Sequence, residues 1–178
     1  MKVAICEYGA GNVRSVRLAF ARLGATETED VLAADLAVLP GVGAARAAMS
    51  GLRDRGHDVA LRERFAAGRP ILGICLGLQL ALEATEEDGG VAGLGLVEGR
   101  ALRLRDGRVP RIGWAPVDDG ETFYFAHSYA ASTPYAVAWS EGIVAEVRHG
   151  AFLGCQFHPE KSGAAGAAYL DSVCRSLV

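Results

Sequence analysis

The sequence predicts a three-layer α/β fold, in which helices cover both faces of an open, mostly parallel sheet that continues into an antiparallel extension. In the first half of the chain, short apolar runs alternate with helical patterns, which is the order expected of a parallel sheet. In the second half, strand patterns follow one another between turn residues. The 178 residues suffice for a single domain, positions 1–178, that buries about 70% of its unfolded surface.

The first half is expected to contain strands at 3–6 and 36–39 and helices at 12–23, 44–55 and 59–67. Gly24 and Gly68 stand where helices commonly stop, because glycine readily adopts the left-handed conformation of a helix C-terminus. The apolar run after Pro70 suits a parallel strand buried on both faces, and good helix formers follow from Gly77. These elements therefore predict a strand–turn–helix unit around residue 75.

The second half is expected to be richer in strands. Residues 101–105 alternate between apolar and charged side chains, and Asp106-Gly107 is typical of a hairpin turn. Further strands are expected at 122–126, 143–147 and 152–157, and a helix at 164–177 closes the chain. We therefore expect the sheet to change character, at about residues 89–99, within one domain.

Composition excludes several classes of protein. The formal net charge of -3 gives no reason to expect a nucleic-acid partner. No window approaches 18 uncharged apolar residues, so no membrane-spanning helix is expected. The apolar run at the start of the chain is too short for a signal peptide. The four cysteines are widely scattered without a CxxC pair, so a cytosolic chain with reduced thiols and no structural metal is expected.

Cys75 is the candidate nucleophile. It stands in the pattern Gly73-x-Cys75-x-Gly77, between the buried strand and the following helix. Flanking glycines remove side chains that would collide at such a strained corner, and the helix N-terminus favours the thiolate. The alternative is a structural cysteine buried on a core strand, since cysteine often behaves as a small apolar residue.

Two glycine-rich segments follow the other expected strands. Tyr8-Gly9-Ala10-Gly11-Asn12 suggests a dinucleotide-binding turn, but Arg14 stands where that fingerprint needs a small residue. Pro40-Gly41-Val42-Gly43 lies at the carboxyl end of its strand, where ligands of open α/β sheets bind. This second loop could face the same crevice as Cys75 or be a plain structural turn.

His158 is the best candidate for the base that a thiol nucleophile needs. Pro159 biases it toward an extended conformation, in which residues two apart point to the same side, so Glu160 can orient the ring while its other nitrogen faces Cys75. His57 and His149 are expected to be exposed, and His127 could either pack or contact a ligand. The pattern thus predicts a Cys-His-Glu triad.

These segments together resemble the class I (triad) glutamine amidotransferases, and within them the glutaminase subunits of imidazole glycerol phosphate synthase. Besides Tyr8–Asn12, Pro40–Gly43 and the Cys75 corner, the matching segments are Gly93-Leu94-Gly95-Leu96-Val97-Glu98-Gly99, Ile112-Gly113-Trp114, Tyr124-Phe125-Ala126-His127-Ser128-Tyr129 and Gln156-Phe157-His158-Pro159-Glu160-Lys161-Ser162. They occur in the family's order and cover nearly the whole chain. The Cys75 corner and His-Pro-Glu are shared by many amidotransferases, whereas the combination of the other segments is typical of this subunit.

The resemblance implies a role for each matched residue. Cys75 attacks the side-chain amide of glutamine, His158 transfers the proton to the departing ammonia, and Glu160 orients His158. The oxyanion is stabilised by the backbone N–H of Leu76 and by one near Val42 or Gly43, after a peptide reorientation coupled to a partner subunit. The residues that hold glutamine are Gln79, Ser128 and Tyr129. No cofactor or metal is implied.

The resemblance also implies a partner, the (β/α)8-barrel cyclase subunit, which receives the ammonia and makes imidazole glycerol phosphate and an aminoimidazole carboxamide ribotide in histidine biosynthesis. The expected interface residues are Asn12, Trp114, Tyr124 and Lys161. The arginines at 103, 105, 108 and 111 could add charge there or lie on a solvated hairpin. The chain departs from the family at Ala45, Arg111 and Ala115, which puts the details of docking in doubt and leaves the triad intact.

Two other functions compete with this one. The first is a related glutaminase such as that of pyridoxal phosphate synthase, which would carry Gly-Gly-Glu-Ser where Pro40–Gly43 stands. The second is a non-catalytic ammonia gate descended from the family, against which the presence of all three triad residues argues. For a true glutaminase subunit we expect little activity from the isolated chain and activation by the partner with its nucleotide ligand.

Overall fold

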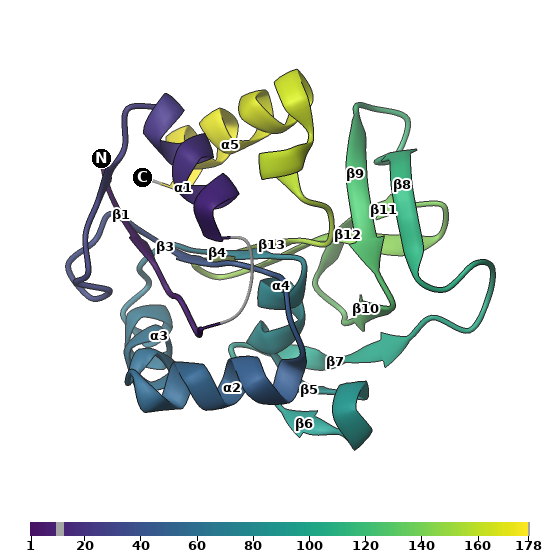
Figure 1. Cartoon of the computed structure of the whole chain (residues 1–178), viewed down its shortest axis with the longest axis horizontal. Helices are drawn as coiled ribbons and strands as arrows, with labels where there is room; N and C mark the ends of the chain where they lie inside the picture. The colour runs from purple at the N-terminus through teal and green to yellow at the C-terminus, as the bar shows by residue number, and fades with distance from the viewer. Residues whose placement is uncertain (10–12, 178) are drawn as a thin grey trace.

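The computed structural model of the chain describes residues 1–9 and 13–177, and its central element is a seven-stranded sheet in the order β11-β12-β13-β4-β3-β1-β2 (Figure 1). Five strands run parallel to one another: β1 (Lys2–Ile5), β2 (Thr26–Glu27), β3 (Leu36–Leu39), β4 (Ile71–Ile74) and β13 (Phe152–Cys155). Two antiparallel strands extend one edge: β12 (Ile143–His149) and β11 (Ala136–Ser140).

Helices cover both faces of this sheet, as the alternating pattern predicts (Figure 1). One face carries α1 (Val13–Arg22) and α5 (Gly163–Leu177), and the other carries α2 (Ala45–Asp54), α3 (His57–Ala66) and α4 (Leu76–Ala81). Strand β3 shows why both layers form: Leu36 and Val38 join the core under α1 and α5, and Ala37 and Leu39 join the core under α2 and α3. Successive side chains of a strand point to opposite faces, so a continuous apolar run needs cover on both.

A second, smaller sheet and a strand pair follow α4. The sheet has the order β10-β7-β5-β6, and β8 pairs only with β9 among the described residues. Their bounds are β5 (Leu82–Thr85), β6 (Val91–Ala92), β7 (Val97–Arg103), β8 (Arg111–Pro116), β9 (Thr122–His127) and β10 (Tyr129–Ser132). Short 3-10 helices lie at Glu87–Gly89 and Pro159–Lys161. The predicted α/β fold with its antiparallel extension is therefore confirmed.

The prediction of a hairpin at Asp106-Gly107 is wrong, because the strands before and after this turn do not pair with each other. Strand β7 is paired on both of its edges, with β5 and with β10, so it has no free edge for the strand that follows the turn. Strand β8 pairs with β9 instead. A turn dipeptide indicates where the chain bends, and the partner of each strand depends on residues far along the chain.

The other predicted elements differ from the structure mainly at their ends. Strand β3 has the predicted bounds, α2 and α3 lie within two residues of theirs, and the strand predicted at 152–157 ends at Cys155. The helix predicted from residue 12 is described only from Val13. His57 and His149 are half-buried and do not stand in open solvent: His57 Nδ1 lies 3.2 Å from Glu7 O, and the His149 ring packs at a tilt against that of Tyr135.

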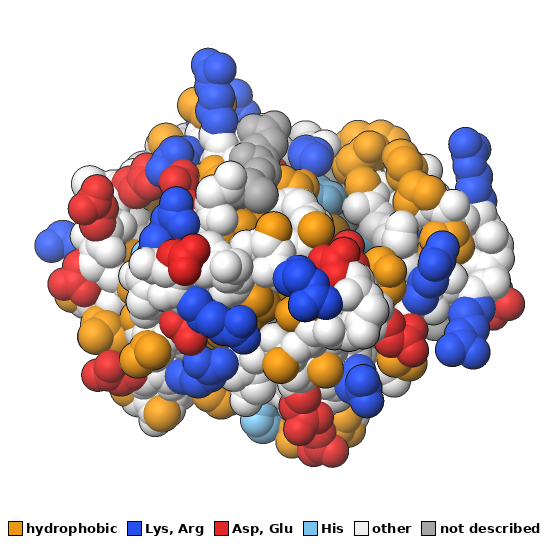
Figure 2. All heavy atoms as spheres, turned by 60° about the horizontal axis from the view of Figure 1, so that its bottom comes forward, with side chains coloured by type: hydrophobic (Ala, Val, Ile, Leu, Met, Phe, Trp, Pro, Cys, Tyr) orange, Lys and Arg blue, Asp and Glu red, His pale blue; other side chains and the backbone are white. Residues whose placement is uncertain are grey.

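Charged side chains of both signs are interspersed over the face around α2 and α3 (Figure 2). This mixture is typical of a solvent-facing helical layer and fits the small net charge of the chain.

Arg64 is an exception among the charged residues, because its side chain is fully buried on α3. Its guanidinium donates to five backbone carbonyl oxygens: Nε to Pro70 at 2.9 Å, Nη1 to Val31 and Ala34 at 2.8 Å and to Leu32 at 3.4 Å, and Nη2 to Asp35 at 2.8 Å. Arg64 thereby joins α3 to the segments that lead into β3 and β4. Nothing local in the sequence distinguishes it from the surface arginines.

Replacing Arg64 with methionine should lower the free energy of unfolding by about 3 kcal/mol, because buried carbonyl groups would lose their donors while the length of the side chain is kept. Urea unfolding followed by circular dichroism measures this loss. The matched control is Arg53→Met, which replaces an exposed arginine on α2. For this variant we expect the free energy of unfolding to change by less than about 0.5 kcal/mol. Equal unfolding midpoints for the two variants would contradict the structural role of Arg64.

Candidate active site

Cys75 lies at a sharp corner between β4 and α4. Its φ of 50° and ψ of -103° lie in a region that non-glycine residues rarely adopt, and its N–H donates to Cys155 O at 2.7 Å. Gly77 is required beside it, since a Cβ at that position would lie 2.0 Å from Leu39 O. The strained corner keeps Cys75 at the start of a helix and at the carboxyl end of the sheet.

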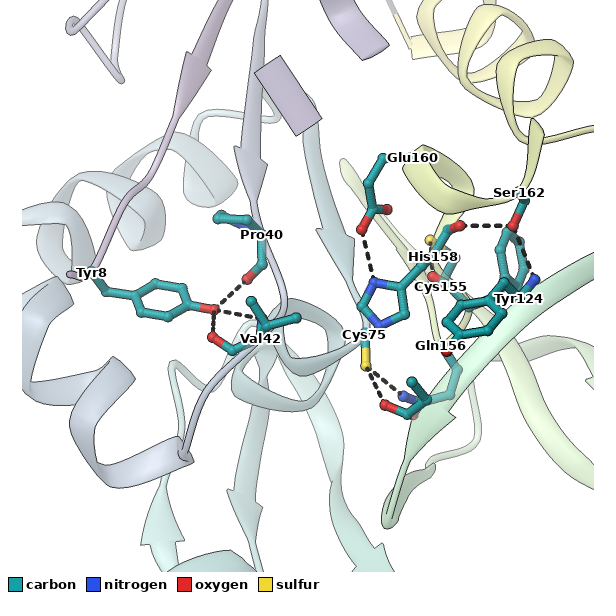
Figure 3. Close-up of polar contacts among 12 residues, drawn as sticks. Tyr8, Pro40, Val42, Cys75, Tyr124, Cys155, Gln156, His158, Glu160 and Ser162 are labelled. Atoms are coloured by element: carbon teal, nitrogen blue, oxygen red, sulfur yellow. Dashed lines mark hydrogen bonds and ion pairs between the residues drawn. The ribbon is translucent and has the colours of Figure 1, made fainter. Parts of the chain in front are cut away.

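The Cys75 side chain faces a cavity of about 250 Å³ and is 5% exposed. The side-chain amide of Gln156 donates to its Sγ at 3.5 Å, and Ala126 O lies 3.9 Å from Sγ (Figure 3). Gln156 was not identified from the sequence as a contact of the thiol, because its position 81 residues away gives no local signal. The thiol thus has polar neighbours and an opening to a ligand-sized space.

His158 and Glu160 form a buried pair beside Cys75. His158 Nδ1 lies 2.9 Å from Glu160 Oε1, and the two side chains are 1% and 4% exposed. The ring lies between the carboxylate and the thiol, with Nε2 on the side of Cys75 (Figure 3). Nε2 has no hydrogen-bond partner within the described part of the chain, so it is available to a reacting group.

The backbone of His158 is fixed as firmly as its ring. Its N–H donates to Tyr124 O at 2.8 Å, and its carbonyl oxygen accepts from the Ser162 hydroxyl at 2.7 Å. The same hydroxyl accepts from the Tyr124 N–H at 3.0 Å, which closes a small ring of contacts between β9 and the 3-10 helix (Figure 3). Ser162 is therefore a positioning residue for His158.

The pKa of His158 is raised to about 9. Burial disfavours the imidazolium, but the interactions of the ring with Cys75 and Glu160 outweigh it. Because this pKa lies above the ordinary value of 6.5, the imidazolium is present at neutral pH and is lost only as pH rises through about 9. A protonated His158 beside Cys75 is suited to donate a proton to a leaving group.

Glu160→Gln should lower the pKa of His158 from about 9 toward 6.5, because a neutral amide stabilises the imidazolium less than a carboxylate does. Titration of the His158 ring by NMR in the wild type and the variant measures the two midpoints. His57, whose pKa is lowered by burial, is an internal control in the same spectra, and its midpoint should be the same in both proteins. An unchanged His158 midpoint in the variant would contradict the role of Glu160.

The loop Pro40–Gly43 packs directly on the Cys75 corner. A Cβ at Gly41 would lie 1.6 Å from Ile74 O and 2.6 Å from Leu76 N, so only glycine fits there. Val42, Gly43 and Leu76 line the same cavity as Cys75. Leu76 begins α4, and the N–H groups of a first helical turn have no acceptor within the helix. The structure thus brings together the three residues named for the oxyanion hole.

The residues named for holding glutamine also line this cavity: Gln79, Ser128 and Tyr129. Gln79 Nε2 donates to Tyr129 O at 2.7 Å, and His127 Nδ1 lies 2.9 Å from the same oxygen. Burial lowers the pKa of His127 to about 4, so its ring is neutral at pH 7. With Nδ1–H donating to Tyr129 O, Nε2 of His127 is a buried acceptor without a partner in the described residues.

Glu87 is a residue of this cavity that sequence analysis missed. It lies on the 3-10 helix after β5, and its Oε2 accepts from the N–H of Ala45 at 3.1 Å. Burial raises its pKa. In the sequence it belongs to the acidic run Glu86-Glu87-Asp88, which has the composition of an exposed turn. Only the fold shows that one carboxylate of the run faces the cavity.

Three of the expected interface residues, Trp114, Tyr124 and Lys161, lie near one another beside His158. Trp114 is 58% exposed, its ring contacts that of Tyr124 at 5.9 Å, and Lys161 Nζ lies 5.9 Å from the same tyrosine ring. Asn12 lies outside the described residues. Arg111 is engaged within the chain, because it pairs with Glu141 at 2.8 Å and lies 4.3 Å over the Phe125 ring. Of the four arginines considered, Arg103, Arg105 and Arg108 remain exposed.

The described residues provide neither a metal-binding cluster nor a membrane-spanning helix. Residues 1–9 and 13–177 contain no cluster of three or more His, Cys, Asp or Glu side chains arranged to hold a metal ion. Within the same residues, no helix is both long and apolar enough to cross a membrane. All four cysteines are free thiols.

Comparison with known proteins gives one consistent family. Residues 8–175 match the family described as glutamine amidotransferase class-I. The chain is 39% identical to a protein of Streptococcus gordonii and 44% identical to one of Symbiobacterium thermophilum, over 92% and 95% of this chain and 91% of each relative. Both relatives bear the name imidazole glycerol phosphate synthase subunit HisH.

Solved structures show the same fold at lower sequence identity. A crystal structure of a glutamine amidotransferase has a TM-score of 0.77 and 20% identity, covering 97% of this chain and 98% of the other. The structure of PurLQS from Thermotoga maritima has a TM-score of 0.72 and 19% identity, with 99% of each chain covered. By the match over residues 8–175 and by its relatives, this chain belongs to the class I glutamine amidotransferase family.

Proposed function

We propose that this chain is the glutaminase subunit of imidazole glycerol phosphate synthase. It hydrolyses the side-chain amide of glutamine to glutamate and ammonia and delivers the ammonia to a cyclase subunit. The observation that carries the proposal is the buried His158–Glu160 pair beside the Cys75 corner, in a chain 39–44% identical to subunits of that name. The rival glutaminase of pyridoxal phosphate synthase is disfavoured by the same relatives and by the Pro40–Gly43 loop.

The reaction follows from the protonated state of His158 beside Cys75. Cys75 attacks the amide carbon as a thiolate, with His158 holding the proton, and forms a tetrahedral oxyanion. The N–H of Leu76 and one N–H of the Val42–Gly43 segment stabilise that oxyanion. His158 then gives its proton to the leaving nitrogen, so ammonia departs and a glutamyl thioester remains on Cys75.

Hydrolysis of the thioester reverses these roles. His158, now neutral, accepts a proton from the attacking water, and the second tetrahedral intermediate collapses to glutamate with return of the proton to the Cys75–His158 pair. Glu160 stabilises each imidazolium that forms and keeps the ring oriented. No redox step or added co-reactant is needed, since glutamine and water become glutamate and ammonia.

The cavity supplies groups of suitable polarity for glutamine. The carboxylate of Glu87 pairs with the α-ammonium of the substrate, and Gln79 with the backbone around Ser128 and Tyr129 orients the rest of the molecule. His127 contributes a neutral acceptor, because its pKa of about 4 leaves the ring uncharged at pH 7. These contacts favour an amino acid with an uncharged amide at the end of its side chain.

The partner is expected to cover the surface of Trp114, Tyr124 and Lys161, where the Tyr124 ring lies beside that of His158. We infer that this partner is the (β/α)8-barrel cyclase subunit, which uses ammonia to make imidazole glycerol phosphate and an aminoimidazole carboxamide ribotide. Ala45 lies inside the chain at the start of α2, so its departure from the family pattern leaves the docking surface unchanged.

An isotope experiment tests the proposal. The chain is purified with a cyclase subunit and given glutamine labelled with ¹⁵N in the amide, together with excess unlabelled ammonium. We expect labelled nitrogen in the imidazole product, because ammonia passes between the sites without mixing with solvent. Product nitrogen that follows the unlabelled pool, or no release of glutamate, would contradict the proposal. Stimulation by the pyridoxal phosphate synthase partner instead would favour the rival.

A further inference from the structure

Arg46 and Asp88 join the start of α2 to the 3-10 helix that carries Glu87. The backbone N–H of Arg46 donates to Asp88 Oδ2 at 3.0 Å, and its guanidinium Nη2 donates to the backbone oxygen of Asp88 at 2.6 Å. The preceding pair makes a parallel contact, because the N–H of Ala45 donates to Glu87 Oε2 at 3.1 Å. Two successive carboxylates thus bind two successive N–H groups of one helix, across 42 residues of sequence.

These carboxylates replace a cap that α2 lacks. Its N-cap residue is Ala44, whose methyl side chain makes no capping hydrogen bond. The first N–H groups of a helix have no acceptor within it, and its positive end favours negative charge. Burial raises the pKa of the Glu87 carboxyl, and the hydrogen bond from Ala45 opposes that rise. The start of α2 therefore both positions the Glu87 carboxylate and favours its charged form.

Asp88 has an unusual backbone conformation at this contact. Its φ of 55° and ψ of 30° lie in the left-handed region, which residues other than glycine rarely adopt. In this conformation its carboxylate binds the helix N–H and its backbone oxygen binds the guanidinium of Arg46. Gly89 and Gly90 follow and have no side chains with which to anchor the segment. Arg46 thus stabilises a strained residue next to Glu87.

Glu87 lines the cavity that Cys75 faces, whereas Arg46 and Asp88 lie outside its lining and are exposed. We propose that Arg46 and Asp88 form a clamp that holds the Glu87 carboxylate at the cavity and so sets the affinity for the α-ammonium group of glutamine, an inference that rests on the proposed glutaminase function. Both act through Glu87 and touch no reacting atom, so they are positioning residues. The ammonium keeps its charge throughout the reaction, so the clamp affects KM and not kcat.

The direction of the effect separates a clamp from a simple effect of charge. Arg46 places a positive charge near the Glu87 carboxylate, so removal of that charge alone would favour a bound cation and lower KM. The clamp predicts the opposite result. Loss of the guanidinium releases the Asp88 backbone, and Glu87 is then held less firmly at the cavity, so KM rises.

Arg46→Met and Asp88→Gly test the clamp in the complex with the cyclase subunit. Methionine keeps the length of the side chain and the helix N–H, and glycine readily adopts the left-handed conformation of residue 88. In each variant we expect KM for glutamine to rise about fivefold, with a change in kcat of less than about twofold. The matched control is Arg53→Met, an exposed arginine at the far end of α2, which should change neither constant.

Two further measurements show whether the clamp acts through Glu87 and the ammonium group. Glutaramate is glutamine without its α-amino group, so it keeps the amide and the carboxylate. Its inhibition constant against glutamine hydrolysis should stay within about twofold of the wild-type value in both clamp variants. Glu87→Gln should raise KM for glutamine by itself, and addition of Arg46→Met to that variant should raise KM no further.

A glutamine KM at or below the wild-type value in folded Arg46→Met and Asp88→Gly chains would overturn the clamp. Equal weakening of glutamine and glutaramate would do the same, because it indicates general damage to the cavity or a contact with the substrate carboxylate. An unchanged KM in Glu87→Gln, or a further rise when Arg46→Met is added to it, would also overturn the clamp. A wild-type complex that releases no glutamate would instead refute the proposed function, so the two failures are distinguishable.

Discussion

Replacing Cys75 with alanine should reduce glutamine hydrolysis by the complex at least about 10³-fold. The thiolate forms the covalent bond to the substrate, and no other cysteine can substitute for it: Cys6 and Cys155 are fully buried, and Cys174 lies on α5. The cavity and the His158–Glu160 pair remain, so glutamine should still bind with a similar affinity. Glutamate release and calorimetric binding of glutamine measure the two effects separately.

The matched control is Cys174→Ala, which removes a half-buried thiol from α5 and should change the rate by less than about twofold. A Cys75→Ala chain that folds and releases glutamate at the wild-type rate would contradict the catalytic assignment. The same result would favour the alternative of a structural cysteine at this corner.

Replacing His158 with asparagine should cause a loss of similar size, because one imidazole both accepts the thiol proton and protonates the leaving nitrogen. Iodoacetamide alkylates thiolates, and the His158 imidazolium favours the thiolate form of a neighbouring thiol. Loss of this imidazolium should therefore also slow alkylation of Cys75 at pH 7. Mass spectrometry of the alkylated peptide follows this reaction. The combined Cys75→Ala, His158→Asn variant should be no less active than Cys75→Ala alone, because the two residues act as a unit.

His149→Asn is the control for this variant. His149 ends β12 opposite Phe152, at the start of β13, whereas His158 follows the far end of β13. Its loss should leave both the turnover and the alkylation rate within about twofold of the wild type. Rapid alkylation and full activity in His158→Asn would show that another group holds the proton.

Local sequence patterns were sufficient to predict the layers of the fold and the centre of the candidate site. Apolar runs on both faces of β3 and β4 require helices on both sides, and glycines at 73 and 77 indicate a strained corner. Proline after His158 places Glu160 two residues away on the same side, and the observed contact at 2.9 Å agrees with that geometry.

Features that depend on distant contacts could not be predicted in this way. In the sequence, Glu87 has the appearance of a surface acid and Arg64 that of a surface base. In the fold, Glu87 lines the cavity, and Arg64 is buried against the segment that leads into β3. Tyr8 was noted only as part of a glycine-rich segment, and its contact with Val42 spans 34 residues. The hairpin at Asp106-Gly107 failed for the same reason, since the pairing of β7 is decided by β5 and β10.

The most direct test of the central claim, that Cys75 hydrolyses glutamine through a covalent thioester, is mass analysis of the complex quenched in acid during turnover. We expect a modified peptide containing Cys75, heavier by the mass of glutamine minus ammonia, that appears before steady state and is absent from Cys75→Ala. An adduct on another residue, or rapid glutamate release by a Cys75→Ala complex, would contradict it.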